Sequence, residues 1–177
     1  MKRYTLPQLR PITIIFLSLL FIGCTHLSVK HLRKNPWSLN TNQTLDMSFW
    51  RFEYEGTFIN NTYNIRGVAY PKKEVIPAWA EWIQDLWLSA YLSDINGHVV
   101  ARDIKVYLPR KLDYDKGVEF EFVLQPEKLP SAGPLFVTFG YTMQLTSHQF
   151  DKPPLIDRPL TGNKGNVFYA SQGAMTR

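Results

Sequence analysis

Side chains that could carry out catalysis are few and scattered in this 177-residue sequence. Ser147 and His148 are adjacent, but a nucleophilic serine also needs an orienting group, and the G-x-S-x-G elbow that exposes such a serine is missing. Glu119 and Glu121 lie two residues apart, so both would project from one face of a strand. They could form a pair of catalytic carboxylates, although a solvated outer face explains them more simply. A hydrolase would therefore need a site assembled from distant residues.

Metal-binding patterns are similarly weak. No two of the four histidines, His26, His31, His98 and His148, have the spacing of metal ligands. Asp113 and Asp115 are spaced like the opening of a calcium loop, but the later oxygen ligands of such a loop are missing. We therefore expect a solvated turn there, and no metal or other non-covalent cofactor.

The remaining reactive side chain is the thiol of Cys24, the only cysteine in the chain. It follows a basic start and an apolar run over residues 12–22. This run is too short for a membrane-spanning helix, which needs about 20 apolar residues, and it is typical of a secretory signal peptide. An uncleaved anchor that begins at Leu9 is one alternative. A secreted protein with an incidental free cysteine is another, although a lone thiol has no intramolecular disulfide partner in an oxidising compartment.

The segment Phe21-Ile22-Gly23-Cys24 resembles the bacterial lipobox. Gly23 and Cys24 match that pattern, whereas Phe21 stands where leucine is preferred. The resemblance implies cleavage after Gly23, a covalent diacylglycerol on the sulfur of Cys24 and an N-acyl group such as palmitate on its amine. It also implies a lipoprotein of the bacterial cell envelope, held at the periplasmic face of a membrane by its lipid anchor. Thr25 favours the outer membrane, because an aspartate at that position is an inner-membrane retention signal in enteric bacteria.

The charge of the chain depends strongly on this signal. The whole sequence has a net charge of +5, but the signal holds three of its 20 basic residues and none of its 15 acidic ones. The mature part therefore has a net charge of only +2. Because no basic stripe remains to neutralise phosphates, we expect no nucleic acid partner.

Composition and turn signals predict one domain after the signal peptide of residues 1–23. Residues 24–46 are expected to be the lipidated cysteine and a flexible tether, residues 47–146 a β-sandwich domain and residues 147–177 an irregular C-terminal tail. The tether contains the basic cluster His26, Lys30, His31, Arg33 and Lys34. This cluster could lie against anionic headgroups or belong to an ordinary solvated linker.

Alternating apolar and polar residues predict strands over 50–58, 118–124 and 135–146. Asn60-Asn61 and Asn96-Gly97 are turn signals between further strands. Residues 78–92 are ambiguous, and we expect a helical turn over 78–83 followed by a strand over 85–93, with one uninterrupted helix as the alternative. Together these features predict an antiparallel, immunoglobulin-like β-sandwich with a short helical insertion.

Part of this pattern is similar to the FxLYD-type immunoglobulin-like modules of bacterial envelope lipoproteins. The similarity lies in the strand over 88–94, the following Asn96-Gly97 turn and the valines Val99 and Val100. Those modules are mostly adaptors or of unknown role, so the resemblance implies no catalytic residue.

Three tryptophans, Trp79, Trp82 and Trp87, lie close together in the sequence. They could form an exposed patch that stacks on sugar rings or binds a partner protein, or they could belong to the core. The sequence thus favours a lipid-anchored, non-catalytic binding or assembly module with an envelope protein as its partner. A carbohydrate-binding module that uses these tryptophans on a glycan is the alternative, and a hydrolase is the third possibility.

Overall fold

The computed structural model of the chain describes residues 26–126, 133–149, 161–164 and 167–176. The signal peptide predicted over residues 1–23, including Gly23, and the lipidation site Cys24 lie outside these residues. The described part consists of strands joined by turns and loops, and it contains no helix. All the strand pairs in it are antiparallel.

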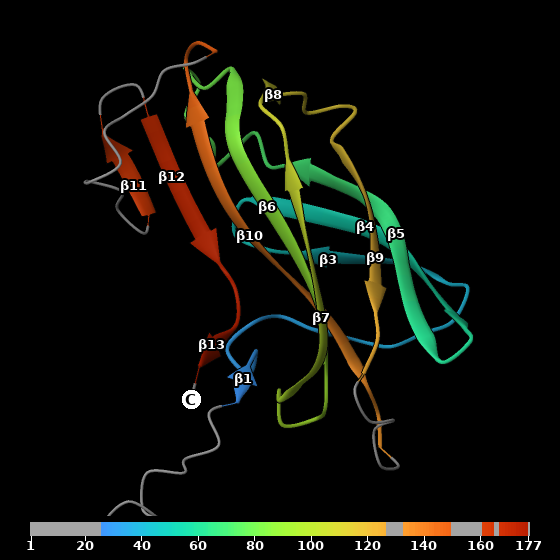
Figure 1. The fold of residues 1–177 in the computed structure, drawn as a ribbon. Coiled ribbons are helices and arrows are strands. Elements are labelled where there is room, and N and C mark those ends of the chain that lie inside the picture. The colour runs from blue at the N-terminus through green and yellow to red at the C-terminus, as the bar shows by residue number, and fades with distance from the viewer. Residues whose placement is uncertain (1–25, 127–132, 150–160, 165–166, 177) are drawn as a thin grey trace, which may run out of the picture.

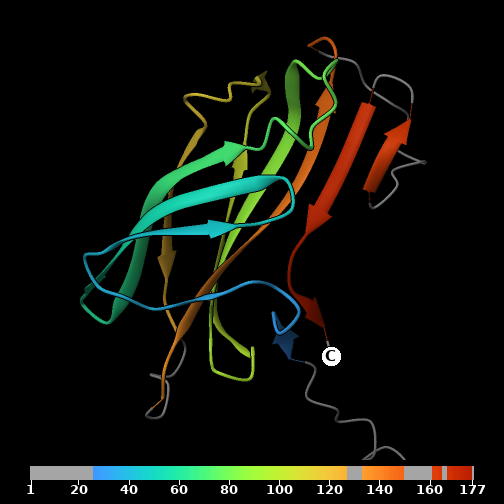
Figure 2. The same cartoon turned by 180° about the vertical axis from the view of Figure 1, so that it is seen from behind.

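The strands form two main sheets that pack face to face (Figure 1, Figure 2). The larger sheet has the order β11 (Thr161–Lys164), β12 (Val167–Gln172), β10 (Phe136–Thr146), β6 (Trp82–Ser93) and β7 (Val99–Tyr107). Its short additional strands are β2 (Asn35–Pro36), which pairs with β10, and β8 (Arg110–Lys111), which pairs with β6. The smaller sheet has the order β3 (Asn42–Asp46), β4 (Trp50–Ile59), β5 (Thr62–Pro71) and β9 (Val118–Leu124). The prediction of an antiparallel β-sandwich is therefore confirmed.

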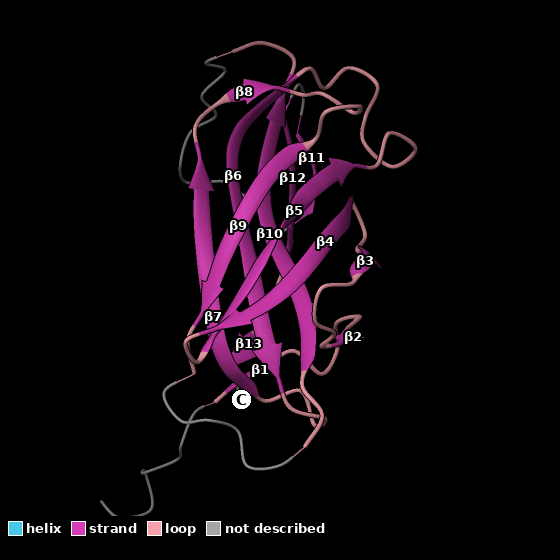
Figure 3. Cartoon of the chain, turned by 90° about the vertical axis from the view of Figure 1, so that its right-hand side faces the viewer, coloured by secondary structure: helices cyan, strands magenta, loops and turns pink. Residues whose placement is uncertain are grey.

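A third, two-stranded sheet pairs the two ends of the described chain. It consists of β1 (Leu27–Ser28) and β13 (Met175–Thr176). Figure 3 shows the long strands running along the molecule, with β1 and β13 at one end.

Aromatic rings fill the space between the main sheets. Phe52 of β4 stacks on Phe139 of β10, with 4.3 Å between the ring centroids and an interplanar angle of 5°. Phe120 and Phe122 of β9 also contact Phe139. These residues are the inward members of the alternating segments, so the period of two in the sequence places them in the core.

The hairpin turns follow the local sequence. Between β4 and β5, both Asn60 and Asn61 have positive φ angles, of 51° and 60°, as a two-residue hairpin turn requires. Between β6 and β7, only Gly97 has a positive φ angle, of 82°. There the Asp94 carboxylate accepts a hydrogen bond from the backbone N–H of His98, at 2.8 Å, which closes the turn.

Residues 26–46 belong to the fold, in contrast to the predicted tether over 24–46. They contain β1, β2 and β3, and Val29 and Leu32 are buried in the core. The apolar residues of this segment have no regular period, which is why it resembles a linker in sequence. Val29, Leu32 and Leu45 are nevertheless buried in the core, so this segment packs with the strands that follow it.

The described parts of the C-terminal segment differ in the same way from the predicted irregular tail over 147–177. Strand β12 pairs with β10 over six residues. Phe168 and Ala170 of this strand lie in the core. Pairing with a long neighbouring strand therefore orders a segment whose sequence shows no clear alternation.

The predicted helical turn over 78–83 is wrong. Strand β6 already begins at Trp82, and a register shift opposite Gln144 and Leu145 leaves Gln84 as an extra residue in β6. Such a β-bulge moves the inward side of a strand by one residue. Ile83 and Leu86 both face the core, and their separation of three residues is what imitates a helix in the sequence.

Candidate binding surface

The three tryptophans that the sequence singles out have different environments. Trp79 is half-buried against the core. Trp82 is half-buried at the start of β6. Trp87 is 47% exposed, and its indole N–H donates a hydrogen bond of 2.9 Å to the carboxylate of Asp85. Of these three side chains, Trp87 alone presents a large part of its ring to solvent.

Trp87 belongs to an apolar stripe on the outer face of the larger sheet. Its Cα partner on the neighbouring strand is Val106 of β7, which is 64% exposed. Ile104 lies two residues before Val106 on the same face, and Leu108 lies two residues after it and is 81% exposed. We call Trp87, Ile104, Val106 and Leu108 the β7 stripe. Single exposed apolar residues are common, but four neighbouring ones indicate an interaction site.

Strand β7 is unusual because its polar row faces inward. Asp103, Lys105 and Tyr107 alternate with the stripe residues and point toward β9, the edge strand of the smaller sheet. The hydroxyl of Tyr107 donates a hydrogen bond to the carbonyl of Glu119, at 3.1 Å. The carboxylate of Asp103 accepts one from the backbone N–H of Val123, at 3.0 Å. The polar row therefore joins the two sheets, while the apolar row is left at the surface.

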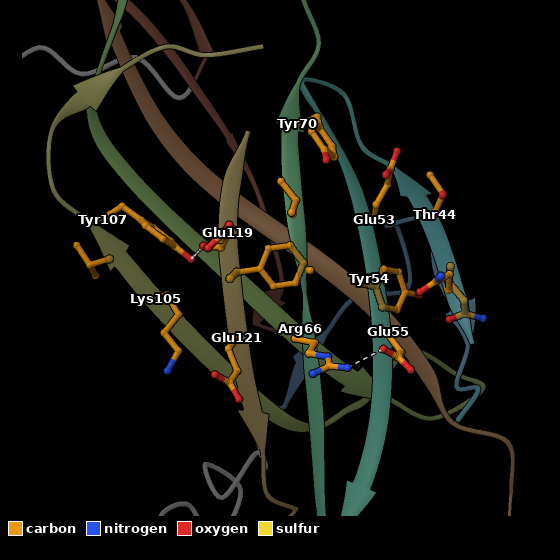
Figure 4. A pocket seen from close by; sticks show the side chains of 16 residues that line it. Thr44, Glu53, Tyr54, Glu55, Arg66, Tyr70, Lys105, Tyr107, Glu119 and Glu121 are labelled. Carbon is orange, nitrogen blue, oxygen red and sulfur yellow. Dashed lines mark hydrogen bonds and ion pairs between the residues drawn. The ribbon is translucent and has the colours of Figure 1, made fainter. Parts of the chain in front are cut away.

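A trough crosses the outer face of the smaller sheet and ends against β7 (Figure 4). Its volume is about 850 Å³, and Lys105, Val106 and Tyr107 form the wall contributed by β7. The charged side chains that line it are Glu53, Glu55, Arg66, Lys105, Glu119 and Glu121. Four carboxylates therefore face two cations. Since Val106 belongs to both features, the trough and the β7 stripe form one continuous surface around this strand.

The charges in the trough are only partly compensated. Arg66 forms an ion pair with Glu55, with 3.1 Å between nitrogen and oxygen, and Figure 4 shows this pair beside β5. Lys105 pairs with Asp103, at 3.3 Å. Within the described residues, neither Glu119 nor Glu121 forms an ion pair. The part of the trough along β9 is therefore negatively charged.

Gly67 of β5 allows the strands of the trough to approach closely. A Cβ atom at this position would lie 2.0 Å from the carbonyl oxygen of Glu53 and 2.8 Å from the Cα of Tyr54. Neither backbone atom can move without a change in the strand. A glycine is therefore required here by the close contact between β4 and β5.

Tyr107, at the wall of the trough, has a raised pKa. Burial raises the pKa of Tyr107 to about 12, a rise that the positive charge of Arg110 opposes and the negative charge of Asp103 supports. The phenol of Tyr107 is thus held in its neutral form, in which its O–H can donate the hydrogen bond to Glu119.

A smaller apolar hollow lies near the tip of the β4–β5 hairpin. Its volume is about 280 Å³, and its lining includes Trp37, Leu39, Phe58 and Tyr63. The ring of Tyr63 contacts those of Trp37 and Phe58, with centroid distances of 5.0 Å and 4.6 Å. Sequence reasoning missed Trp37 because it lies in the segment interpreted as a tether.

The other sequence candidates do not converge on one site. Glu119 and Glu121 face the trough, while Ser147 and His148 form a local contact of 2.9 Å at the surface. Asp113 closes a turn, because its carboxylate accepts hydrogen bonds from the backbone N–H groups of Lys116 and Asp115. These hydrogen bonds, above all the one from Lys116, lower the pKa of Asp113.

In the part of the chain that the structure describes, no group of three or more His, Cys, Asp and Glu side chains is arranged to hold a metal ion. None of the described residues belongs to a helix that is long and apolar enough to cross a membrane.

No protein-family model matches this sequence, and neither a curated protein nor a solved structure matches it significantly. The resemblances to the lipobox and to the FxLYD-type modules therefore stay predictions.

Proposed function

We propose that this protein is a lipid-anchored, non-catalytic binding module of the bacterial cell envelope, which binds a partner protein through the surface around β7. The observation that supports this proposal best is the orientation of β7. In most half-buried strands the apolar row faces the core, whereas here Ile104 and Val106 face solvent. An apolar row at the surface lowers the free energy of a complex when a partner covers it.

The chemistry of this surface defines the partner it fits. The β7 stripe would take apolar side chains, and the adjoining trough, with four carboxylates and two cations, would favour basic ones. Because the side chains that line the trough are spread across the strands from β7 to β3 (Figure 4), an extended protein segment fits it better than a compact small molecule. The partner is therefore a protein with a segment that carries both apolar and basic residues.

The location follows from the lipobox-like segment. Lipid on Cys24 would hold the module at the periplasmic face of a membrane, and Thr25 favours the outer one. Two or three acyl chains give durable anchoring, whereas a single chain is only marginally retained.

The anchor is tested by growing the source bacterium with labelled palmitate. We expect the wild-type protein to incorporate the label and Cys24→Ala to incorporate none. An unlabelled wild-type protein would contradict the lipoprotein proposal, independently of the result for the β7 surface.

The binding surface is tested by chemical cross-linking in the envelope, with wild type, Val106→Asp and a control. Val75→Asp is a suitable control because Val75 is also an exposed valine but lies in the loop after β5. We expect Val106→Asp to lose a specific cross-linked partner that carries a basic and apolar segment, while Val75→Asp keeps it. If both variants keep the same partners, the β7 surface is not the binding site.

Binding of a carbohydrate is the second candidate function, because the Trp87 ring is exposed and Asp85 holds its indole N–H. A fixed, exposed ring of this kind can stack on the face of a sugar. This function predicts that Trp87→Ala abolishes retention on an envelope polysaccharide, while Trp82→Ala retains part of it. Equal retention of wild type and Trp87→Ala would exclude it.

A further inference from the structure

Three segments that are distant in the sequence meet at the end of the sandwich where the described chain begins. They are residues 26–34, the β6–β7 turn over 94–98 and residues 173–176. Figure 1 shows β1, β13 and this turn together at the lower end of the molecule. We call the surface formed by these three segments the basal face.

Backbone contacts hold the basal face together. The N–H of Val29 donates a hydrogen bond of 2.8 Å to the carbonyl of Gly97, and a Cβ at Gly97 would lie 2.7 Å from the Cα of Lys30. Leu27 pairs with Thr176 in the small sheet. A side-chain contact of 3.0 Å joins His31 to the carbonyl of Gly173. The basal face is therefore a defined surface of the fold and not part of a flexible linker.

The basal face carries an excess of positive charge. Lys30 and Arg33 are exposed, and Lys34 is half-buried, with its ammonium group hydrogen-bonded to the carbonyl of Ile95 at 2.8 Å. Asp94 is the one acidic residue in the three segments, and it contacts the ring of His98, at 3.1 Å. The fold thus brings the basic cluster seen in the sequence to one end of the molecule.

Two large apolar side chains project from the same basal face. Ile95 at the tip of the β6–β7 turn is 63% exposed, and Met175 of β13 is 54% exposed. Exposed apolar residues next to lysine and arginine are the combination that binds a bilayer surface. The apolar tips enter the headgroup region, and the cations contact anionic lipids.

The position of the proposed anchor agrees with this chemistry. Cys24 precedes His26, the first described residue, by two positions, and two residues span at most about 7 Å. Lipid on Cys24 would therefore keep the basal face within about one headgroup layer of the membrane. A flexible tether over 24–46 would allow the domain any orientation on the membrane. Strand β1 begins at Leu27, so the chain between the lipid and the fold is too short for that freedom.

We propose that the basal face docks on an anionic lipid surface and orients the domain on the membrane. This inference rests on the proposed lipid anchor and adds a second, non-covalent contact to it. Strand β7 begins at the basal face and ends at Tyr107, so at about 3.3 Å per residue its far end lies about 26 Å away. Docking would therefore point Val106 and Leu108 of the β7 stripe toward the periplasm, where a partner can reach them.

Spin labels can measure this orientation in the full mature lipoprotein. Once lipid occupies Cys24, an introduced cysteine is the only free thiol, so Ile95→Cys and Met175→Cys each carry one label. Leu108→Cys, at the other end of the molecule, is the control. The proteins are reconstituted in vesicles of phosphatidylcholine with phosphatidylglycerol, or of phosphatidylcholine alone, and label depth is read from collisions with oxygen and with a water-soluble nickel complex.

We expect the labels at positions 95 and 175 to collide mainly with oxygen in the anionic vesicles, and the label at 108 mainly with nickel. The basal labels should become accessible to nickel in phosphatidylcholine alone and in the double variant Lys30→Glu/Arg33→Glu. Lys111→Glu/Lys116→Glu, which changes the net charge equally at other exposed positions, should leave them inserted.

Two results would overturn the docking proposal. One is equal nickel access at all three positions in anionic vesicles. The other is insertion of the basal labels that depends on neither the lipid charge nor Lys30 and Arg33. The mass of the purified protein reports lipidation separately. A mass without lipid would contradict the proposed anchor, and docking would then be decided by whether the same labelled chain sediments with anionic vesicles but not with phosphatidylcholine.

Discussion

The hydroxyl of Tyr107 and the backbone carbonyl of Glu119 lie 3.1 Å apart and form a hydrogen bond between the edge strands of the two sheets. Strands β7 and β9 share no backbone ladder in the described structure. Side chains take over this role, because Asp103 of β7 also binds the backbone N–H of Val123 in β9. This side of the sandwich is therefore closed by the polar row of β7.

Replacing Tyr107 by phenylalanine removes the hydroxyl that bridges the two strands and keeps most of the ring packing. We expect Tyr107→Phe to lower the free energy of unfolding by about 0.5–1.5 kcal/mol, the usual contribution of a hydrogen bond, in urea titrations. Tyr70→Phe removes a hydroxyl from another tyrosine that lines the trough, on β5, and should be nearly neutral. If both variants have the stability of the wild type, the bridge contributes nothing to the closure of the sandwich.

Alkaline pH should destabilise the protein because three tyrosines are held neutral in the folded state. Burial raises the pKa values of Tyr54, Tyr107 and Tyr141 from 10.0 to about 12. Between these values the unfolded chain releases protons that the folded chain keeps, so the free energy of unfolding falls as the pH rises from about 10 to about 12. Denaturation curves across this range, with tyrosinate absorbance recorded in parallel, check the prediction. Ionisation of all tyrosines near pH 10 without unfolding would contradict it.

The alternating strands could be predicted from the sequence because burial on one face imposes a period of two. This holds for Phe52, Phe122 and Phe139, which all lie in the core. Residues 26–37 could not be placed in this way. Val29 and Leu32 are buried in a core built mostly of segments far away in the sequence, and the N–H of Val29 bonds to the carbonyl of Gly97. Such distant contacts leave no local period.

For a related reason, the candidate surface could be predicted from the sequence only in part. In β7 the sequence shows two alternating rows, one with Ile104 and Val106 and the other with Asp103 and Lys105. Local rules place the apolar row inside. In this fold the polar row faces inward instead, because polar side chains of β7 form hydrogen bonds with backbone groups at the edge of β9. The exposed stripe therefore depends on how the two sheets meet, which no single strand encodes.

The aromatic stack at the centre of the core should carry a large share of the stability. Phe139 contacts the rings of Phe52, Tyr54, Phe120 and Phe122, so truncation leaves a cavity that these rings cannot fill. We expect Phe139→Ala to cost about 3–5 kcal/mol. Val123→Ala at an exposed position of β9 should cost far less. A loss of under about 1 kcal/mol for Phe139→Ala would mean that the core collapses around the cavity.

Gly67 offers a test of the close approach between β4 and β5. Since a Cβ there would lie 2.0 Å from the carbonyl oxygen of Glu53, Gly67→Ala forces the two strands apart. We expect a loss of at least about 1–3 kcal/mol from overpacking, measured by thermal unfolding. Gly173→Ala is the matched control, because a Cβ at that position would meet only the Tyr91 hydroxyl, at 3.3 Å. Wild-type stability of Gly67→Ala would show that the hairpin relaxes without cost.

The bulge at Gln84 makes the sharpest prediction about β6. Gln84 is the extra residue of the strand, and its side-chain oxygen is buried with no hydrogen-bond partner among the described residues. Gln84→Ala should therefore be neutral or slightly stabilising, because it removes a buried polar atom that gains nothing. Deleting Gln84 is a different change, because it brings Ile83 to two residues from Leu86 and keeps both side chains inward in a regular alternation without the bulge. Ile83 can then still pair with Leu145, and Trp82 with Thr146. We therefore expect urea titrations to give the two variants similar free energies of unfolding. A much less stable deletion variant would mean that the bend and twist that the bulge adds to β6 are needed for its packing.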